Sequence, residues 1–341
     1  MNSPSTLSPQ NTKYCFDFVN GSCPRTIRSL VSFSAMYMTM MGAIILTMGG
    51  NLVVVISIAH FKQLHSPTNF LILSLAAADF LVGLLVMPYS MVRSIDSCWY
   101  FGEWFCKLHT CCDIMLCTTS IFHLCFISVD RYYAVCQPLH YITKITNPVI
   151  AVFVLISWSV PCFLAVGKVL SDGIQDYVTS ISCIGACSLT LNKLWGVLAS
   201  LIAFFIPGTV MVGVYEHIFM VAKDQARKIH KVSAVSQSVS DTKKMSLKKE
   251  SKAAKTLSVV MGVFILCWLP FFIATMADPF INFSTPEDLF NAFLWLGYFN
   301  SAFNPIIYGL FYPSFHKAFK SILTGKIFSS DSSIMNLYSN R

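Results

Sequence analysis

The residues of this chain best suited to chemistry are two aspartates, Asp79 and Asp113, that lie inside long apolar stretches. A charged side chain in such a place costs about 2.5–3.5 kcal/mol on membrane-insertion scales, so each predicts a functional site. In a later stretch Trp268, Phe271 and Phe272 occupy positions i, i+3 and i+4 and form one aromatic helix face. Such a face is ordinarily packing. Beside a lone carboxylate it favours a site for an ammonium group, which gains from charge pairing and cation–π contacts.

Further residues are expected at the depth of Asp113. Trp295 and Tyr298 lie at a comparable depth in the last apolar stretch, and Cys117 follows Asp113 by one helical turn. We therefore predict that these three side chains also contact the ligand.

Asp79 has no basic residue at a similar depth in any apolar stretch. Its carboxyl must therefore be protonated, hydrated or paired with a bound cation. Asn51, Asn300, Ser301 and Asn304 could supply oxygens around Na⁺. The alternative is a protonated, hydrogen-bonded carboxyl. The cysteine and histidine spacing suggests no other metal, and no cofactor is expected.

Asp130, Arg131 and Tyr132 close the stretch that contains Asp113, and Asp113 and Arg131 are 18 residues apart. That is about 27 Å of helix, close to the hydrocarbon thickness of a bilayer. Glu250 and Trp268 are also 18 residues apart. If Trp268 lies at the depth of Asp113, the same helical rise places Glu250 level with Arg131. We predict an Arg131–Glu250 ion pair, the alternative being that Glu250 is one charge in a solvated, lysine-rich run.

The elements that must position these residues are membrane-spanning helices. The chain is 55% hydrophobic and 12% charged, against about 25% charged in a soluble domain. A helix needs about 20 apolar residues to cross a bilayer. Seven stretches qualify: 33–59, 70–92, 108–129, 150–167, 194–214, 256–277 and 289–311. The predicted fold is an all-α seven-transmembrane helix bundle.

The distribution of basic residues sets the orientation. With the N-terminus outside, the inner segments hold 16 Lys and Arg and the outer segments hold six. The formal net charge of +8 therefore lies mostly on the inner face, where it sets the membrane orientation and contacts anionic lipid. A nucleic-acid partner is not expected. We predict an extracellular segment at 1–32, a receptor domain at 33–311 and a cytoplasmic tail at 312–341. The inner loop at 221–255 is expected to be partly disordered at its centre.

An amphipathic helix is predicted after the last span. Phe311, Phe315, Phe319 and Ile322 are spaced by four, four and three residues, with lysines between them, as in a helix on the inner membrane surface. No cysteine follows, so the tail has no site for a palmitoyl anchor. Nothing in the first 30 residues resembles a cleaved signal peptide.

Glycosylation is expected on the outer face at Asn20, in the sequon Asn20-Gly21-Ser22. Six cysteines lie outside or at the outer boundary, where disulfides are permitted, and those within the spans are expected to be small packing residues.

The ordered motifs of the whole chain resemble the rhodopsin-like (class A) G-protein-coupled receptors. They are Gly50-Asn51, Leu75 with Asp79, Asp130-Arg131-Tyr132, Trp158, Pro207 with Tyr215, Cys267-Trp268-Leu269-Pro270 and Asn304-Pro305-Ile306-Ile307-Tyr308. Three further segments, 300–312, Ser97–Gly102 and Asn20–Cys23, resemble the trace amine-associated receptors. Ser314 stands where that family usually has Trp, which weakens packing of the membrane-surface helix.

The resemblance implies several roles. Asp113 would anchor an amine, and Asp130, Arg131, Tyr132, Glu250, Tyr215 and Tyr308 would form the switch that engages a heterotrimeric G protein. Two disulfides are implied, Cys106–Cys187 and Cys23–Cys183, and they leave Cys15 and Cys98 either free or paired with each other. The family further implies a multi-pass plasma-membrane receptor, a stimulatory or olfactory-type G protein, rising cyclic AMP and an olfactory role.

The fifth span narrows the expected ligand. Counting back from Pro207, its pocket-facing residues are Ala199, Ser200 and Ala203. Catecholamine receptors place several serines here and diamine-preferring relatives add a carboxylate, whereas this chain offers one hydroxyl. We expect a small primary or methylated monoamine with an aromatic body.

Other functions fit less well. A class A receptor for another biogenic amine or for a non-amine ligand is the alternative that stays open. A retinal-binding opsin would need a lysine within 289–311, which has none, and Asp113 with its aromatic residues argues against a peptide or lipid ligand. A transporter would show paired repeats, and an enzyme would show a nucleophile–base pair. The sequence shows neither, so no enzymatic activity is expected.

Overall fold

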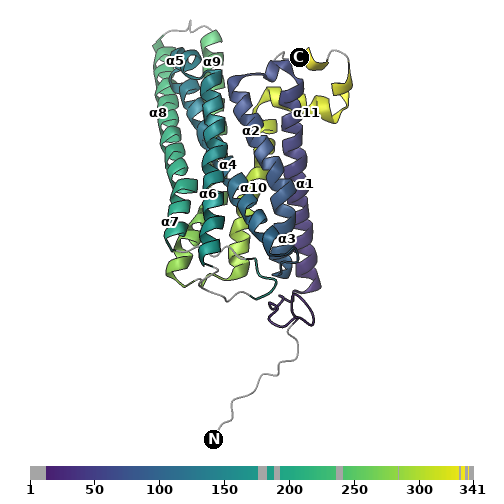
Figure 1. Ribbon diagram of the computed structural model, residues 1–341. Helices are drawn as coiled ribbons and strands as arrows, with labels where there is room; N and C mark the ends of the chain where they lie inside the picture. Colours follow the sequence, from purple (N-terminus) through teal and green to yellow (C-terminus); the bar gives the residue numbers. More distant parts are fainter. Residues whose placement is uncertain are drawn as a thin grey trace.

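The computed structural model describes residues 13–175, 183–187, 193–235, 241–282, 284–329, 332–334 and 337. Within them the chain forms helices and two isolated β-bridges, Tyr14 with Pro24 and Ser22 with Ile184. Figure 1 shows the long helices side by side, with α5, α11 and the start of α9 at one end and the N-terminal segment at the other.

The bundle is built from seven helical segments that cross it from end to end. They are α1 (Leu30–His60), α2 with η2 and α3 (Pro67–Leu81, Val82–Val86 and Met87–Asp96), α4 (Glu103–Cys136), α6 (Asn147–Gln175), α7 with η3 and α8 (Lys193–Ser200, Leu201–Phe205 and Ile206–Val235), α9 (Asp241–Ala277) and α10 (Glu287–Phe311). Short helices connect or follow them: η1 (Lys62–Leu64), α5 (Pro138–Lys144), η4 (Asp278–Phe280), α11 (Pro313–Leu323), η5 (Lys326–Phe328) and η6 (Ser332–Ile334).

Six of the described helices are long and apolar enough to cross a membrane. The seventh, α10, has 25 residues and packs against α1 and α9, and the asparagines and tyrosines along it make it less apolar. Two of them, Tyr298 and Asn304, contact Asp113 and Asp79. The predicted seven-transmembrane bundle is confirmed, although α1, α4 and α6 are longer than the apolar stretches because polar residues continue a helix into water.

Two π-helical turns interrupt the bundle. The turn η2 ends two residues before Pro88, and η3 ends two residues before Pro207. Because proline lacks an N–H and its ring displaces the preceding carbonyl, a widened turn accommodates the misfit. Pro207 is one of the motif residues that carry the resemblance, whereas nothing in the sequence singled out Pro88. The two prolines Pro270 and Pro305 lie inside α9 and α10.

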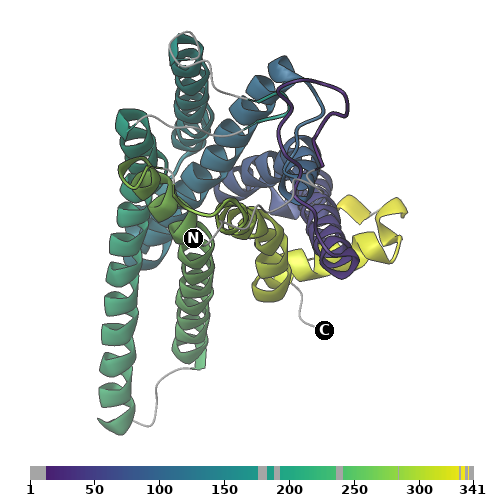
Figure 2. The same cartoon turned by 90° about the horizontal axis from the view of Figure 1, so that it is seen from below.

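The predicted inner loop at 221–255 is shorter than expected. The helix α8 continues to Val235 and α9 begins at Asp241, and Figure 2 shows α8 projecting far beyond its neighbours. Lysines and alanines in this segment are good helix formers, so the chain remains helical after it leaves the apolar layer. The centre of the predicted loop, 236–240, lies outside the described residues, as do 176–182 and 188–192 of the outer loop.

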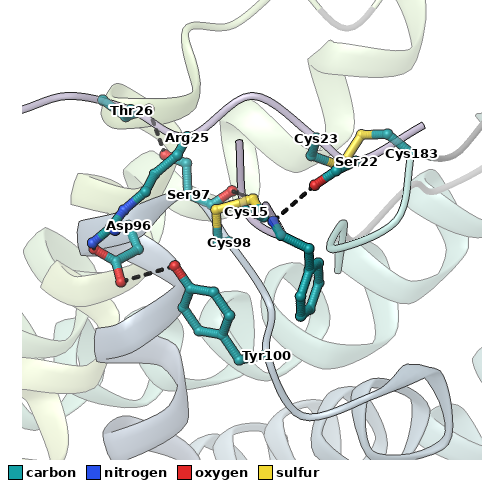
Figure 3. The surroundings of a disulfide bond; sticks show 11 residues. Cys15, Ser22, Cys23, Arg25, Thr26, Asp96, Ser97, Cys98, Tyr100 and Cys183 are labelled. Carbon is teal, nitrogen blue, oxygen red and sulfur yellow. Dashed lines mark hydrogen bonds and ion pairs between the residues drawn. A yellow bond between two sulfur atoms is a disulfide. The ribbon is translucent and has the colours of Figure 1, made fainter. Parts of the chain in front are cut away.

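A disulfide-linked cap covers the outer end, and Figure 3 shows it at close range. Cys15 pairs with Cys98, Cys23 with Cys183 and Cys106 with Cys187. The last two are the pairs that the resemblance implied, and the first resolves the alternative left open for the remaining cysteines. Asn20 is exposed beside this cap, as a glycosylation site requires.

Main-chain hydrogen bonds and an ion pair hold the cap together. Cys23 donates to Ile184 O at 2.9 Å, and Trp99 donates to Gly185 O at 2.8 Å. Gly185 has a positive φ of 99°, and a Cβ there would lie 3.0 Å from the Cβ of Cys15, so only glycine fits. Arg25 bonds Asp96 at 2.7 Å, and this hydrogen bond raises the pKa of Arg25.

Loss of the Cys23–Cys183 disulfide should destabilise the protein. Its 160-residue sequence separation means that the bond strongly restricts the unfolded chain, an effect typically worth about 2–5 kcal/mol. Cys23→Ser and Cys183→Ser should lower surface delivery and the melting temperature of the purified protein equally, and the double variant should be no worse. Cys162→Ser, at an exposed free cysteine, should change neither quantity. Additive losses in the double variant would contradict the pairing.

Candidate functional site

Asp113 is the centre of the outer half of the bundle. It lies on α4 and is only 4% exposed. Its Oδ2 accepts a hydrogen bond of 2.8 Å from the hydroxyl of Tyr298, and its Oδ1 accepts one of 3.4 Å from the thiol of Cys117. Among the described residues it forms no ion pair. The carboxylate therefore has hydrogen-bond donors for both oxygens, but no cationic side chain of the described residues balances its negative charge.

A cavity opens beside this carboxylate between α4, α6, α7, η3, α9 and α10. Its volume is about 80 Å³, and its lining residues are Asp113, Ile114, Cys117, Thr118, Ile121, Leu164, Trp195, Ala199, Ser200, Ala203, Trp268, Phe271, Phe272, Thr275, Phe290 and Leu294. One water needs roughly 10–15 Å³ on the same measure, so the space suits a small organic molecule. Of these residues Asp113 alone carries a formal charge.

Aromatic rings form one wall of the cavity. Phe204 and Phe272 stack with centroids 4.7 Å apart, and Phe271 meets Phe272 edge-on at 5.4 Å. The indole of Trp268 lies against Gly297, where an added Cβ would be 2.6 Å from the ring. Glycine at this position lets α10 approach α9, so the sequence-predicted face of Trp268, Phe271 and Phe272 does line the cavity.

The cavity also contains hydroxyls that lack partners. Ser200 Oγ on α7 and Thr275 Oγ1 on α9 are buried, and neither has a hydrogen-bond partner within the described structure. The indole N–H of Trp268 is also buried without a hydrogen-bond partner within the described structure. A ligand that carries a polar substituent could satisfy these groups. Ser200 was predicted from the sequence, whereas Thr275 was not.

Tyr298 and Trp295 lie behind the cavity lining, so their predicted contact with the ligand stays a prediction. Tyr298 bonds Asp113 and also lies 3.1 Å from the hydroxyl of Ser90, and the indole N–H of Trp295 donates to Ser94 at 3.1 Å. Both side chains therefore orient the site from α10. No sequence motif marks Ser90 or His109, whose ring nitrogen lies 3.3 Å from the Ser90 hydroxyl.

Other lining residues were missed because nothing in the sequence marks them. Trp195, Phe290 and Leu294 come from α7 and α10, and Ile114, Thr118, Ile121 and Leu164 come from α4 and α6. They are ordinary apolar or small residues of a spanning helix. Only helical phase relative to Asp113 could have selected those on α4.

Asp79 forms a second buried polar cluster. Its Oδ1 accepts from Ser301 at 2.8 Å, and its Oδ2 accepts from Asn304 at 2.7 Å. Asn51 donates to Ser301 O at 3.0 Å while its own Oδ1 stays buried without a partner, as does the amide nitrogen of Asn300. Asn51, Ser301 and Asn304 therefore lie together at Asp79, whereas the amide nitrogen of Asn300 bonds none of them. Carboxylate, hydroxyl and amide oxygens are ligands that a hard cation prefers, and the Na⁺ site stays a prediction.

The inner end of α4 carries a network around Asp130. Its carboxylate accepts from Arg131 Nε at 2.8 Å, from Tyr141 at 3.1 Å and from Thr68 at 3.0 Å. Arg131 also donates to the Thr68 hydroxyl at 2.6 Å. Glu250 belongs to α9, but its side chain lies outside the described residues, so the predicted Arg131–Glu250 pair stays a prediction.

Three tyrosines of the predicted switch lie in the inner half of the bundle. Tyr132 packs edge-on against His217 at 5.3 Å, Tyr215 lies 3.1 Å from the Ser128 hydroxyl, and Tyr308 is buried with its ring 5.8 Å from Phe315. They come from α4, α8 and α10. Tyr132 and Tyr215 thus join α4 to α8, and Tyr308 joins α10 to α11.

Comparison with known proteins supports a single family. Residues 50–308 match the 7 transmembrane receptor (rhodopsin family). Trace amine-associated receptor 4 of Mus musculus is 64% identical over 99% of both chains. Trace amine-associated receptor 2 of Rattus norvegicus is 51% identical over 97% of both, and trace amine-associated receptor 13c of Danio rerio is 52% identical over 96% of both.

These matches cover the site and the switch as well as the bundle. They identify a receptor and not an enzyme, and with its spanning helices the protein is a multi-pass protein of the plasma membrane. The chain belongs to the rhodopsin family of seven-transmembrane receptors, and within it to the trace amine-associated receptors.

Proposed function

We propose that this receptor binds a small aromatic monoamine in the cavity beside Asp113 and signals through a stimulatory or olfactory-type G protein that raises cyclic AMP. The observation that carries the proposal is a buried carboxylate with no cation, at an apolar and aromatic cavity. An ammonium that leaves water must replace its hydration with a fixed opposite charge. Asp113 supplies that charge.

The walls favour an aromatic body on the amine. Phe271, Phe272 and Trp268 offer ring faces and edges to a flat apolar group. A second carboxylate for a diamine is missing from the described lining residues, so a monoamine fits better. Ser200 and Thr275 admit a ring with or without a hydroxyl, and the names of the relatives support a trace amine.

The inner end supports coupling to a G protein. Arg131 is held by Asp130 and Thr68, and its release would expose a guanidinium between the inner ends of α4, α8 and α9. A ligand shifts the equilibrium between the state with Arg131 held and the state with Arg131 released only if it binds one of them more tightly. Detection of volatile amines in olfaction is the physiological role that we infer from the family.

Replacing Asp113 with Asn should abolish the amine response, because it keeps the shape and removes the charge. Loss of one partner of a buried charged pair costs roughly 2–5 kcal/mol, which is about thirty-fold in affinity or more. Cyclic AMP should be measured across a panel of volatile amines at matched surface expression.

Two controls make this test specific. Asp17→Asn, at an exposed acid of the outer segment, should leave potency unchanged, and an uncharged analogue of the best agonist should be inactive on the parent receptor. A response of Asp113→Asn to the same amine at near-parent potency would overturn the proposed site.

Replacing Glu250 with Gln should raise signalling without agonist, because the proposed pair with Arg131 holds the inactive state. Basal cyclic AMP at matched surface level is the measurement. Glu216→Gln, at an exposed acid in the first half of α8, is the matched control and should stay at the parent level. Unchanged basal signalling in Glu250→Gln would argue against the pair.

Replacing Asp79 with Asn should remove the effect of Na⁺ on agonist affinity. If Na⁺ binds between Asp79, Ser301 and Asn51 in the inactive state, then raising NaCl should weaken agonist binding to the parent receptor. Choline chloride at the same ionic strength should not. Identical salt responses of the variant and the parent would exclude Asp79 as the cation site.

A further inference from the structure

A second, larger hollow lies on the outside of the bundle at its inner end, far from the amine cavity. It has a volume of about 930 Å³ and runs between α1, α10 and α11. Figures 1 and 2 show these three helices together, with α11 lying across the inner end of the bundle beside α1. Its lining residues are Leu46, Gly49, Gly50, Val53, Pro305, Ile306, Gly309, Leu310, His316, Phe319, Lys320, Leu323 and Thr324.

Glycines shape the floor of this groove. A Cβ on Gly50 would lie 2.6 Å from Pro305 Cγ, and one on Gly309 would lie 3.1 Å from the Phe319 ring. These two glycines let α10 approach α1 and α11 closely. Gly49 differs from them, because a Cβ there would meet no atom within 4 Å. The groove is therefore open where Gly49 has no side chain.

Apolar side chains form its walls, and they face outward. Leu310 is 71% exposed and Leu323 is 79% exposed. In a seven-helix bundle that spans a membrane, such surfaces on α1 and α10 meet lipid chains and not water. The α11 helix marks the depth of the inner leaflet, where lipid head groups begin.

The rim on α11 is cationic. His316, Lys320 and Thr324 are spaced by four residues and therefore lie in one row along the helix. The segments that build the groove, 30–60 and 289–330, contain no Asp or Glu. Within the described structure Lys320 forms no ion pair, so its positive charge is available to an external anion.

These features together select one kind of occupant. An apolar trough next to a row of cationic and hydroxyl groups, at the level of the inner leaflet, matches a lipid with an acyl chain and an anionic head group.

We propose that the groove between α1, α10 and α11 binds one anionic phospholipid of the inner leaflet. Its acyl chain lies over Gly49 between Leu46 and Leu310, and its phosphate meets Lys320 and His316. The lipid fills the space between α11 and α1 and so fixes α11 against the bundle. The site is independent of the amine cavity.

The test uses the full-length purified receptor and native mass spectrometry with phosphatidylserine or phosphatidylcholine of identical acyl chains. We expect one tightly retained phosphatidylserine per receptor and about five-fold weaker retention of phosphatidylcholine, as for about one cationic contact at a membrane surface. Glycerophosphoserine, which has the head group without chains, should not compete. Equal retention of the two lipids, or competition by the head group alone, would overturn the proposal.

Two variant pairs locate the site. Gly49→Leu should fill the trough and reduce retention of both lipids, whereas Gly42→Leu, on the same helix with equally open space and outside the groove, should not. Lys320→Gln should remove the preference for phosphatidylserine, whereas Lys326→Gln, an exposed lysine of η5, should keep it. Equal effects of the two variants in either pair would contradict a lipid site in this groove. Lys320→Gln lies at an exposed position, so it provides the test even if Gly49→Leu fails to fold.

Discussion

The uncompensated charge of Asp113 is the constraint on which the outer half of this receptor depends. A carboxylate that is almost fully buried needs hydrogen bonds, a counter-charge or a proton. The fold gives it two hydrogen-bond donors, Tyr298 and Cys117, and leaves the charge to the ligand. The stability of the empty receptor and its affinity for a cation therefore depend on the same atoms.

The surrounding elements hold that carboxylate in place. Tyr298 is fixed in turn by Ser90, which also lies close to His109, so α3, α4 and α10 meet behind the cavity. The Cys106–Cys187 bond ties the outer end of α4 to the outer loop, and the two other disulfides join the N-terminal segment to the same cap. Glycine at 297 brings the Trp268 ring against α10. Each contact limits how the site can relax.

The sequence was sufficient to predict the features that follow from polar residues placed within apolar, membrane-spanning stretches. Asp113, Asp79 and their helices follow from the cost of burying charge, and the aromatic face of Trp268 follows from helical spacing. It could not tell that Trp295 and Tyr298 lie behind the cavity lining, because depth along a helix does not tell which side faces the cavity. It missed Ser90, Thr275 and the π-turn before Pro88, since these depend on packing between helices. The long α8 was missed because leaving the membrane does not end a helix.

The two buried aspartates are linked by α10. Tyr298 donates to Asp113, while Ser301 and Asn304, three and six residues further along the same helix, donate to Asp79. In the proposed complex, an ammonium at Asp113 would compete with the Tyr298 hydroxyl for Oδ2. Weakening that bond changes how firmly α10 is held at its outer half, and the same helix carries the Asp79 contacts and ends beside Tyr308 and α11. Since Pro305 removes one backbone hydrogen bond of α10, its inner part can move relative to its outer part. A ligand bound as proposed would therefore act on the inner end of the bundle through α10, because this helix carries the hydrogen bonds to both aspartates.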